Sequence, residues 1–242
     1  MRERILNQPL DTFNINEAAY VAKMALVNPR QLRIITLNPE MVVTARKNFE
    51  FQAAINNSHL IIPDGTGIVW ASQLLNGEEI ERVPGIELAE KILEAANELG
   101  KKVAIYGSKK EVLEKAVSKL KEKYPNIQIV KAINGYELQE KNGKVAEDIA
   151  SGNPDLVLVA LGSPKQEIWI NKHALLFPRC VMIGIGGSLD IWSGVKKRAP
   201  EWMRNAHLEW LYRVITEPKR IIRILVTLPR FVWMVVREKY LH

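Results

Sequence analysis

The sequence predicts an α/β fold in which a mostly parallel sheet carries helices on both faces. Two observations predict it: short apolar runs rich in β-branched residues recur between residues 32 and 187, and stretches with helical spacing of apolar residues separate them. The length of 242 residues suits one large domain or a small pair. A content of 47% hydrophobic and 25% charged residues is that of an ordinary globular protein, which excludes disordered and disulfide-stapled classes.

Each predicted strand is a short, almost wholly apolar run. Such runs are typical of strands that are buried on both faces of a parallel sheet. The predicted strands are residues 32–38, 59–63, 103–107, 127–130, 156–162 and 181–187.

Helices are predicted where apolar residues recur every three or four positions. Residues 86–99 form such a stretch and stop at Gly100, and residues 109–123 form another that stops before Pro125. Strands that alternate with helices in this way predict a Rossmann-like sheet with parallel strands.

The chain changes character after residue 194. Residues 1–193 contain 23 Lys and Arg against 23 Asp and Glu, whereas residues 194–242 contain 11 against 4, so the net charge of +7 arises in the tail. The prolines at 200, 218 and 229 are expected to divide the tail into short helical segments. We therefore predict a first domain over residues 1–194 and a basic amphipathic C-terminal appendage over residues 195–242.

The appendage combines arginine, tryptophan and branched apolar residues, which favours a segment that lies on a membrane surface. Arg213 with Arg220, and Arg223 with Arg230 and Arg237, approximate cationic stripes because helical residues seven apart nearly superpose. The alternative is an amphipathic helix packed on the same chain. The apolar content disfavours nucleic acid as the partner, and the longest apolar run is too short to span a bilayer.

The chain is expected to remain in the cytoplasm, peripherally associated with the inner face of the cell membrane. The only cysteine, Cys180, cannot form an intramolecular disulfide, and the N-terminal charges are not followed by the apolar run of a signal peptide. The sequence does not give the oligomeric state, but self-association could mask an exposed apolar appendage, so a homo-oligomer is left open.

Polar residues follow the first two predicted strands, where open parallel sheets bind ligands. Thr36 and Asn38 follow the first strand, and Asp64 and Gly65 follow the second. Turn chemistry alone explains an isolated Asn-Pro or Asp-Gly pair, but two such clusters on adjacent strands favour the floor of a ligand site. Asp64 is the best candidate for an acid or base; the alternative is that it caps the helix beginning near Ile68.

Two further segments are candidates for binding phosphate. Arg82 lies in a predicted loop, as either a surface charge or a bidentate ligand for an anion. Residues 162–167 follow a very apolar strand and open a helix, so their backbone amides and Lys165 predict a diphosphate site, with Gln166 facing the cleft.

The glycine-rich run that follows the last predicted strand resembles part of a dinucleotide fingerprint. Gly184, Gly186 and Gly187 would let a nucleotide approach the backbone, but Leu189 stands where the fingerprint needs its third glycine. No acidic residue follows at the position that binds a ribose, so hydride chemistry is disfavoured.

No cofactor and no metal ion are expected. The four histidines are isolated along the chain, and no pair of aspartates flanks a single spacer to hold a nucleotide-bound cation. The Gly-Lys-Ser/Thr loop of kinases and the Gly-x-Ser-x-Gly elbow of hydrolases are missing from the sequence.

Six motifs in order resemble those of the WecG/TagA/CpsF family of bacterial glycosyltransferases. The resemblance extends from about residue 5 to the tail, and six ordered motifs are more specific than any one of them. The motifs are TLNPEMV, PDGTGIVW, ERVPGIEL, GSPKQEIWI, GIGGSLDIWSGVKKRAP and EWLYRVITEP.

The resemblance implies an inverting, metal-independent glycosyltransferase of wall teichoic acid synthesis. It would move N-acetylmannosamine from UDP-N-acetylmannosamine (UDP-ManNAc) to the 4-hydroxyl of GlcNAc-diphosphoundecaprenol, forming a β-1,4 linkage. Asp64 is implied as the base, since inversion by single displacement needs one base and stabilisation of the departing diphosphate. The other implied substrate-binding residues are Thr36, Asn38, Arg82, Gln166, Gly184, Gly186, Gly187, Asp190, Arg213, Arg220 and Arg223.

Other functions remain open at this stage. The same chemistry could use another donor, such as UDP-N-acetylmannosaminuronic acid or UDP-glucose. A non-catalytic nucleotide-sugar-binding protein that docks on membranes would keep the glycine clusters but would need no base. A nucleic-acid binder would show a steep dependence of affinity on salt concentration.

Overall fold

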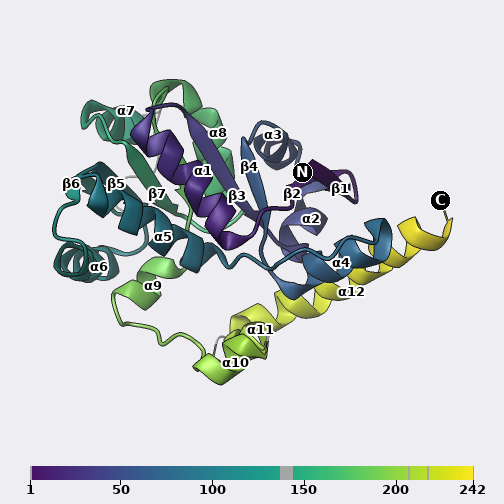
Figure 1. Cartoon of the computed structure of the whole chain (residues 1–242). Coiled ribbons are helices and arrows are strands. Elements are labelled where there is room, and N and C mark those ends of the chain that lie inside the picture. The colour runs from purple at the N-terminus through teal and green to yellow at the C-terminus, as the bar shows by residue number, and fades with distance from the viewer. Residues whose placement is uncertain (1, 137–143, 207, 217, 242) are drawn as a thin grey trace.

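The computed structural model describes residues 2–136, 144–206, 208–216 and 218–241 (Figure 1). Six parallel strands form the main sheet, and all six predicted strands are confirmed. They are β3 (Leu32–Leu37), β4 (Leu60–Pro63), β5 (Lys102–Gly107), β6 (Gln128–Ile133), β7 (Leu156–Ala160) and β8 (Val181–Gly184), in the spatial order β4-β3-β8-β7-β5-β6. The last two are shorter than predicted, because residues 161–162 and 185–187 leave the sheet as loops.

Helices cover both faces of this sheet, as predicted. The helices described before residue 194 are α1 (Ile15–Val27), α2 (Pro39–Ala45), α3 (Phe49–Asn56), α4 (Thr66–Asn76), α5 (Gly85–Glu98), α6 (Lys110–Lys123), α7 (Lys144–Ser151), α8 (Lys165–Lys172) and α9 (Ser188–Trp192), with a short 3-10 turn η1 (Ala174–Leu176). Successive strand residues point to opposite faces. Ile34 packs with α1, α5 and α6, whereas Ile35 packs with α2, α3 and α4 on the other face.

An antiparallel hairpin precedes the sheet and was not predicted. Strand β1 (Arg2–Ile5) pairs with β2 (Gln8–Asp11). Arg2 donates to both carboxylate oxygens of Asp11 at 2.8 and 2.7 Å, and one of these oxygens also accepts from the backbone N–H of Ile61 at 2.8 Å. The hairpin is thereby fixed to strand β4 of the main sheet.

The tail forms α10 (Glu201–Asn205), α11 (Glu209–Thr216) and α12 (Pro218–Leu241). Pro218 is the first residue of α12. The first N–H groups of a helix make no hydrogen bond within the helix, so a proline costs none at this position. The prediction that Pro229 interrupts the helix is wrong: Pro229 lies inside α12. A proline within a helix removes one backbone hydrogen bond, and the burial of Phe231, Met234 and Val235 directly after it offsets that cost.

Helix α12 packs on the core of the first domain. Phe231, Met234 and Val235 join the cluster of buried side chains formed by α2, α3 and α4. Figure 1 shows α12, in yellow, running alongside α4. Within the described ranges, no helix combines the length and apolar content needed to cross a membrane. The division into domains at residue 194 stays a prediction.

Replacement of the buried anchor of α12 should destabilise the protein. Phe231 is fully buried, so Phe231→Ala is expected to lower the free energy of unfolding by about 3–5 kcal/mol, measured by urea denaturation. Trp233→Ala is the matched control, because Trp233 is 59% exposed on the same helix and its loss should cost less than about 1 kcal/mol. Equal losses from both variants would contradict this account of how α12 docks.

Candidate functional site

A cavity of about 1050 Å³ opens at the carboxyl ends of the central strands. The register of the sheet explains its floor: Leu37 of β3 lies opposite Pro63 of β4, so the residues that follow the two strands lie side by side. Most of the predicted site residues line this one cavity. They are Thr36, Asn38, Asp64, Gly65, Arg82, Gln166, Gly184, Gly186, Gly187 and Asp190.

Asn38 serves both as a helix cap and as part of the cavity wall. Its side-chain oxygen accepts from the backbone N–H of Met41 at 3.0 Å, and Pro39 takes the first position of α2. The turn chemistry that the Asn-Pro pair indicates is therefore present. Turn chemistry and a place in the ligand site are therefore compatible for Asn38, since its capping of α2 fixes it at the cavity floor.

Asp64 is held at the end of β4 by two contacts. Its backbone N–H donates to the carbonyl of Leu37 at 2.8 Å, and its Oδ2 accepts from the N–H of Gly85 at 3.3 Å. The alternative prediction, that Asp64 caps α4, is wrong, because the N-cap residue is Gly65. Gly65 has φ of 106°, which side chains disfavour, so a glycine is needed for this turn.

Gln166 ties the loop after β7 to the loop after β8. Its Oε1 accepts from the N–H of Gly162 at 3.2 Å and from the N–H of Gly186 at 3.0 Å. A Cβ atom at Gly184 would lie 2.5 Å from Gln166 Nε2, so Gly184 makes room for this side chain. The amides of Gly162 and Gly186, predicted to face phosphate or nucleotide, are thus already bound by Gln166.

Glu167 is a buried acid at the cavity that the sequence analysis did not single out. Burial raises the pKa of Glu167, and a hydrogen bond from Gln166 Nε2 to Glu167 Oε1 at 2.7 Å opposes the shift. Glu167 lies in the segment 162–167, which the sequence analysis had proposed for phosphate binding, so its position gave a signal for a site residue. A glutamate in the first turn of a helix is, however, most simply explained by its favourable interaction with the helix dipole.

The structure does not bring every predicted residue to the cavity. Lys165 is exposed at the start of α8 and is not part of the cavity lining. Asp190, by contrast, lines the cavity and pairs with Lys196 Nζ at 2.9 Å. The predicted diphosphate cradle at residues 162–167 therefore lacks its lysine.

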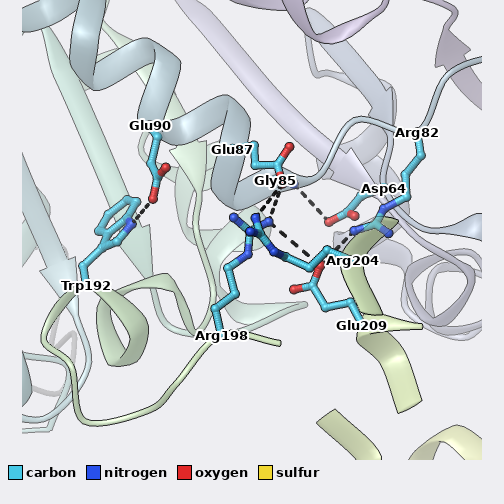
Figure 2. A network of polar contacts seen from close by, with 9 residues as sticks. All are labelled: Asp64, Arg82, Gly85, Glu87, Glu90, Trp192, Arg198, Arg204 and Glu209. Carbon is cyan, nitrogen blue, oxygen red and sulfur yellow. Dashed lines mark hydrogen bonds and ion pairs between the residues drawn. The ribbon is translucent and has the colours of Figure 1, made fainter. Parts of the chain in front are cut away.

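Arg82 is the first member of an ionic network between the core and the tail (Figure 2). Its Nη2 lies 2.9 Å from Glu209 Oε2, and the two side chains are only 13% and 7% exposed. Arg82 is therefore not a surface charge; it binds an anionic group, which here is a carboxylate of α11. Sequence analysis included Glu209 only as the first residue of the motif EWLYRVITEP and had no signal for its pairing with Arg82, because the two residues are 127 positions apart.

The network continues through Arg198, Glu87 and Arg204. Arg198 binds Glu87 of α5 and lies 4.0 Å from Glu209 Oε2. Arg204 Nη1 lies 3.9 Å from the same Glu87 oxygen that Arg198 contacts. Figure 2 shows the three guanidinium groups alternating with the two carboxylates beside Asp64.

The tail also forms part of the cavity wall. Trp210, Tyr212 and Thr216 of α11 and Ile224, Thr227 and Leu228 of α12 line it. The predicted arginines at 213, 220 and 223 belong to these two helices, but their side chains lie outside the described part of the chain. The helices that carry them and the strand end that carries Asp64 thus border the same cavity.

These features define an α/β protein of the Rossmann-like class with one large ligand cavity at the strand ends. The chain belongs to the glycosyl transferase WecG/TagA/CpsF family, whose family model matches residues 3–242. This result confirms the family that the six motifs predict, and the chain is accordingly a glycosyltransferase.

Curated relatives cover most of the chain. One from Bacillus subtilis (strain 168) is 42% identical over 206 residues, which is 85% of this chain and 79% of the relative. One from Staphylococcus aureus (strain NCTC 8325 / PS 47) is 38% identical over 208 residues, which is 86% of this chain and 81% of the relative. Both are named N-acetylglucosaminyldiphosphoundecaprenol N-acetyl-beta-D-mannosaminyltransferase.

The contact between Gly184 and Gln166 can be tested directly. Gly184→Ala is expected to displace Gln166, since the added Cβ would lie 2.5 Å from its Nε2, and to lower the free energy of unfolding by about 1–3 kcal/mol, measured by urea denaturation. The double variant Gly184→Ala/Gln166→Ala removes the clash and should recover part of the lost stability. No loss in the single variant, or no recovery in the double variant, would refute this account of the contact.

Proposed function

We propose that the protein transfers N-acetylmannosamine from UDP-ManNAc to the 4-hydroxyl of GlcNAc-diphosphoundecaprenol in wall teichoic acid linkage-unit synthesis. The names of the relatives support the acceptor and the transferred sugar. The observation that carries the proposal is Asp64: a carboxylate held by the N–H of Gly85 at the floor of a cavity large enough for two sugars.

In this proposal Asp64 is the general base. The 4-hydroxyl of the acceptor sugar gives its proton to Asp64 as its oxygen attacks the anomeric carbon of the donor, and the bond to UDP breaks on the opposite side. The product is therefore a β-linked sugar with inverted configuration. The N–H of Gly85 orients the carboxylate without neutralising it.

The departing UDP needs positive charge where its own negative charge develops. We assign this role to arginines of the tail at 213, 220 and 223, which belong to helices that border the cavity. Guanidinium groups bind phosphate oxygens in a forked geometry, so no metal ion is required. Thr36, Asn38 and Gln166 would position the donor sugar from the floor.

The exposed face of the tail supports attachment to the inner face of the cell membrane. Ile215 and Leu225 are 70% and 67% exposed, and Trp233 is also exposed beside Arg237, whose guanidinium carbon lies 5.2 Å from the tryptophan ring centre. Apolar side chains next to arginines are typical of segments that lie in a membrane interface. A lipid-linked acceptor would be met on that surface.

Replacement of the proposed base should abolish transfer and leave binding intact. Asp64→Asn keeps the size of the side chain but removes the proton acceptor, so the transfer rate should fall at least about 100-fold while UDP affinity stays within twofold. Product mass is measured with UDP-ManNAc, a panel of other UDP-sugars and a short-chain acceptor, without added divalent cation. Asp148→Asn, an exposed replacement on α7, is the control. Retained turnover in Asp64→Asn would remove it from the base role.

Charges placed on the exposed tail should release the protein from membranes. The double variant Ile215→Glu/Leu225→Glu is expected to reduce sedimentation with anionic phospholipid vesicles by about tenfold or more, because two apolar contacts are lost and two charges repel the lipid. Leu175→Glu is the control, since Leu175 is 94% exposed on η1. Equal vesicle binding by all three proteins would argue against attachment through the tail.

A further inference from the structure

The ionic network contains two arginines that have no part in the proposed function. Arg198 lies between α9 and α10, and Arg204 lies in α10. Together with Arg82 they alternate with Glu209 and Glu87. Arg82, Arg198 and Glu209 of this network line the cavity, so two of its arginines border the space where a ligand would bind.

Each guanidinium group keeps one buried donor without a partner. The Nε atoms of Arg82, Arg198 and Arg204 are buried and make no hydrogen bond to any residue in the described ranges. A buried N–H that lacks an acceptor costs free energy, because its hydrogen bonds to water are not replaced. Because these atoms are shielded from the cavity, a bound anion would offset that cost through its negative charge and not by accepting from Nε.

Glu209 shows how these arginines hold an anionic oxygen, and because Glu209 fills that position a phosphate would bind beside it. Its Oε2 lies 2.9 Å from Arg82 Nη2 and 4.0 Å from Arg198 Nη2, so one oxygen lies between two guanidinium groups. A phosphate oxygen binds guanidinium groups in the same forked geometry as a carboxylate oxygen does. The spacing of Arg82 and Arg198 therefore suits a phosphate group.

The cluster is connected to the proposed base through the first turn of α5. Gly85, whose N–H binds Asp64, lies two residues before Glu87, which binds Arg198. An acceptor sugar with its 4-hydroxyl at Asp64 carries its diphosphate on carbon 1, across the sugar ring. The cluster lies beside Asp64 (Figure 2), so in our proposal that diphosphate extends toward it.

Exposed tryptophans favour a lipid-linked diphosphate over a nucleotide. Trp202 lies in α10 two residues before Arg204, and Trp210 follows Glu209 and lines the cavity. Both are exposed. Tryptophan next to arginine is typical of surfaces where phosphate meets hydrocarbon, whereas the diphosphate of a nucleotide is joined to a polar ribose.

We infer that Arg198, with Arg82, forms the subsite for the diphosphate of the lipid-linked acceptor, and that Arg204, which does not line the cavity, holds Glu87 beside Arg198. This inference rests on the proposed function, which supplies that acceptor. It gives the two diphosphates of the reaction separate places: that of the donor at the tail arginines 213, 220 and 223, and that of the acceptor beside the segment from residue 196 to residue 209.

Two variants test the subsite, and neither removes one partner of the Arg198–Glu87 pair while keeping the charge of the other. Arg198→Lys keeps the positive charge but loses the fork, and Glu87→Gln/Arg198→Gln removes both members of a pair. In each, the Kd for a short-chain GlcNAc-diphosphate lipid, measured by calorimetry, and the KM for it should rise about tenfold or more, while UDP affinity and Tm change little. Arg33→Lys is the matched control, because Arg33 also has a buried Nε without a partner among the described residues but lies in β3 away from the cavity lining.

The possible outcomes separate this inference from the proposed function. Unchanged acceptor affinity in both variants would overturn it, and the network would then only join the tail to α5. Weaker UDP binding with unchanged acceptor binding would also overturn it, since the arginines would then hold the donor. A wild-type protein that binds the lipid probe through Arg198 but transfers no sugar would contradict the proposed function and support the subsite.

Discussion

The buried ionic network that starts at Arg82 and Glu209 is the constraint on which the site depends. Two charged groups taken out of water lose much of their hydration energy, so a buried pair is tolerated only when both partners are held in place. Glu209 belongs to the tail and Arg82 to the core, and each is almost fully buried. Separation of the tail from the core would break this pair, which favours the arrangement that closes the cavity.

The parallel sheet determines which side chains meet at the floor of the cavity that the tail closes. Strands β3, β8 and β7 are neighbours although other elements separate them in the sequence, so the residues after each strand emerge at one edge. Asp64 reaches this edge because β4 pairs with β3, and Gln166 then links the two glycine loops. Rigid strands thus place the floor, and hydrogen bonds between loops fix its shape.

Much of the fold follows from the sequence, whereas the contacts within the site follow only in part. Apolar runs such as 156–160 predict strands because burial on both faces demands continuous hydrophobicity. The N-terminal hairpin gave no such signal: its turn places Leu6 and Asn7 at positive φ, where glycine is usual. The position of Asp64 follows from the strand-end rule, but the pairing of Arg82 with Glu209 depends on packing between segments distant in sequence.

The tail shows why one amphipathic helix can satisfy two interpretations that first seem exclusive. Packing on the same chain and docking on a membrane both predict apolar and basic residues at helical spacing. Helix α12 buries Phe231 and Val235 against the core, while Leu225 and Trp233 of the same helix remain exposed. Because α12 also lines the cavity, membrane contact on its exposed face would affect the position of the cavity wall. The proposed membrane surface and the proposed acceptor subsite would then be two parts of one structural unit.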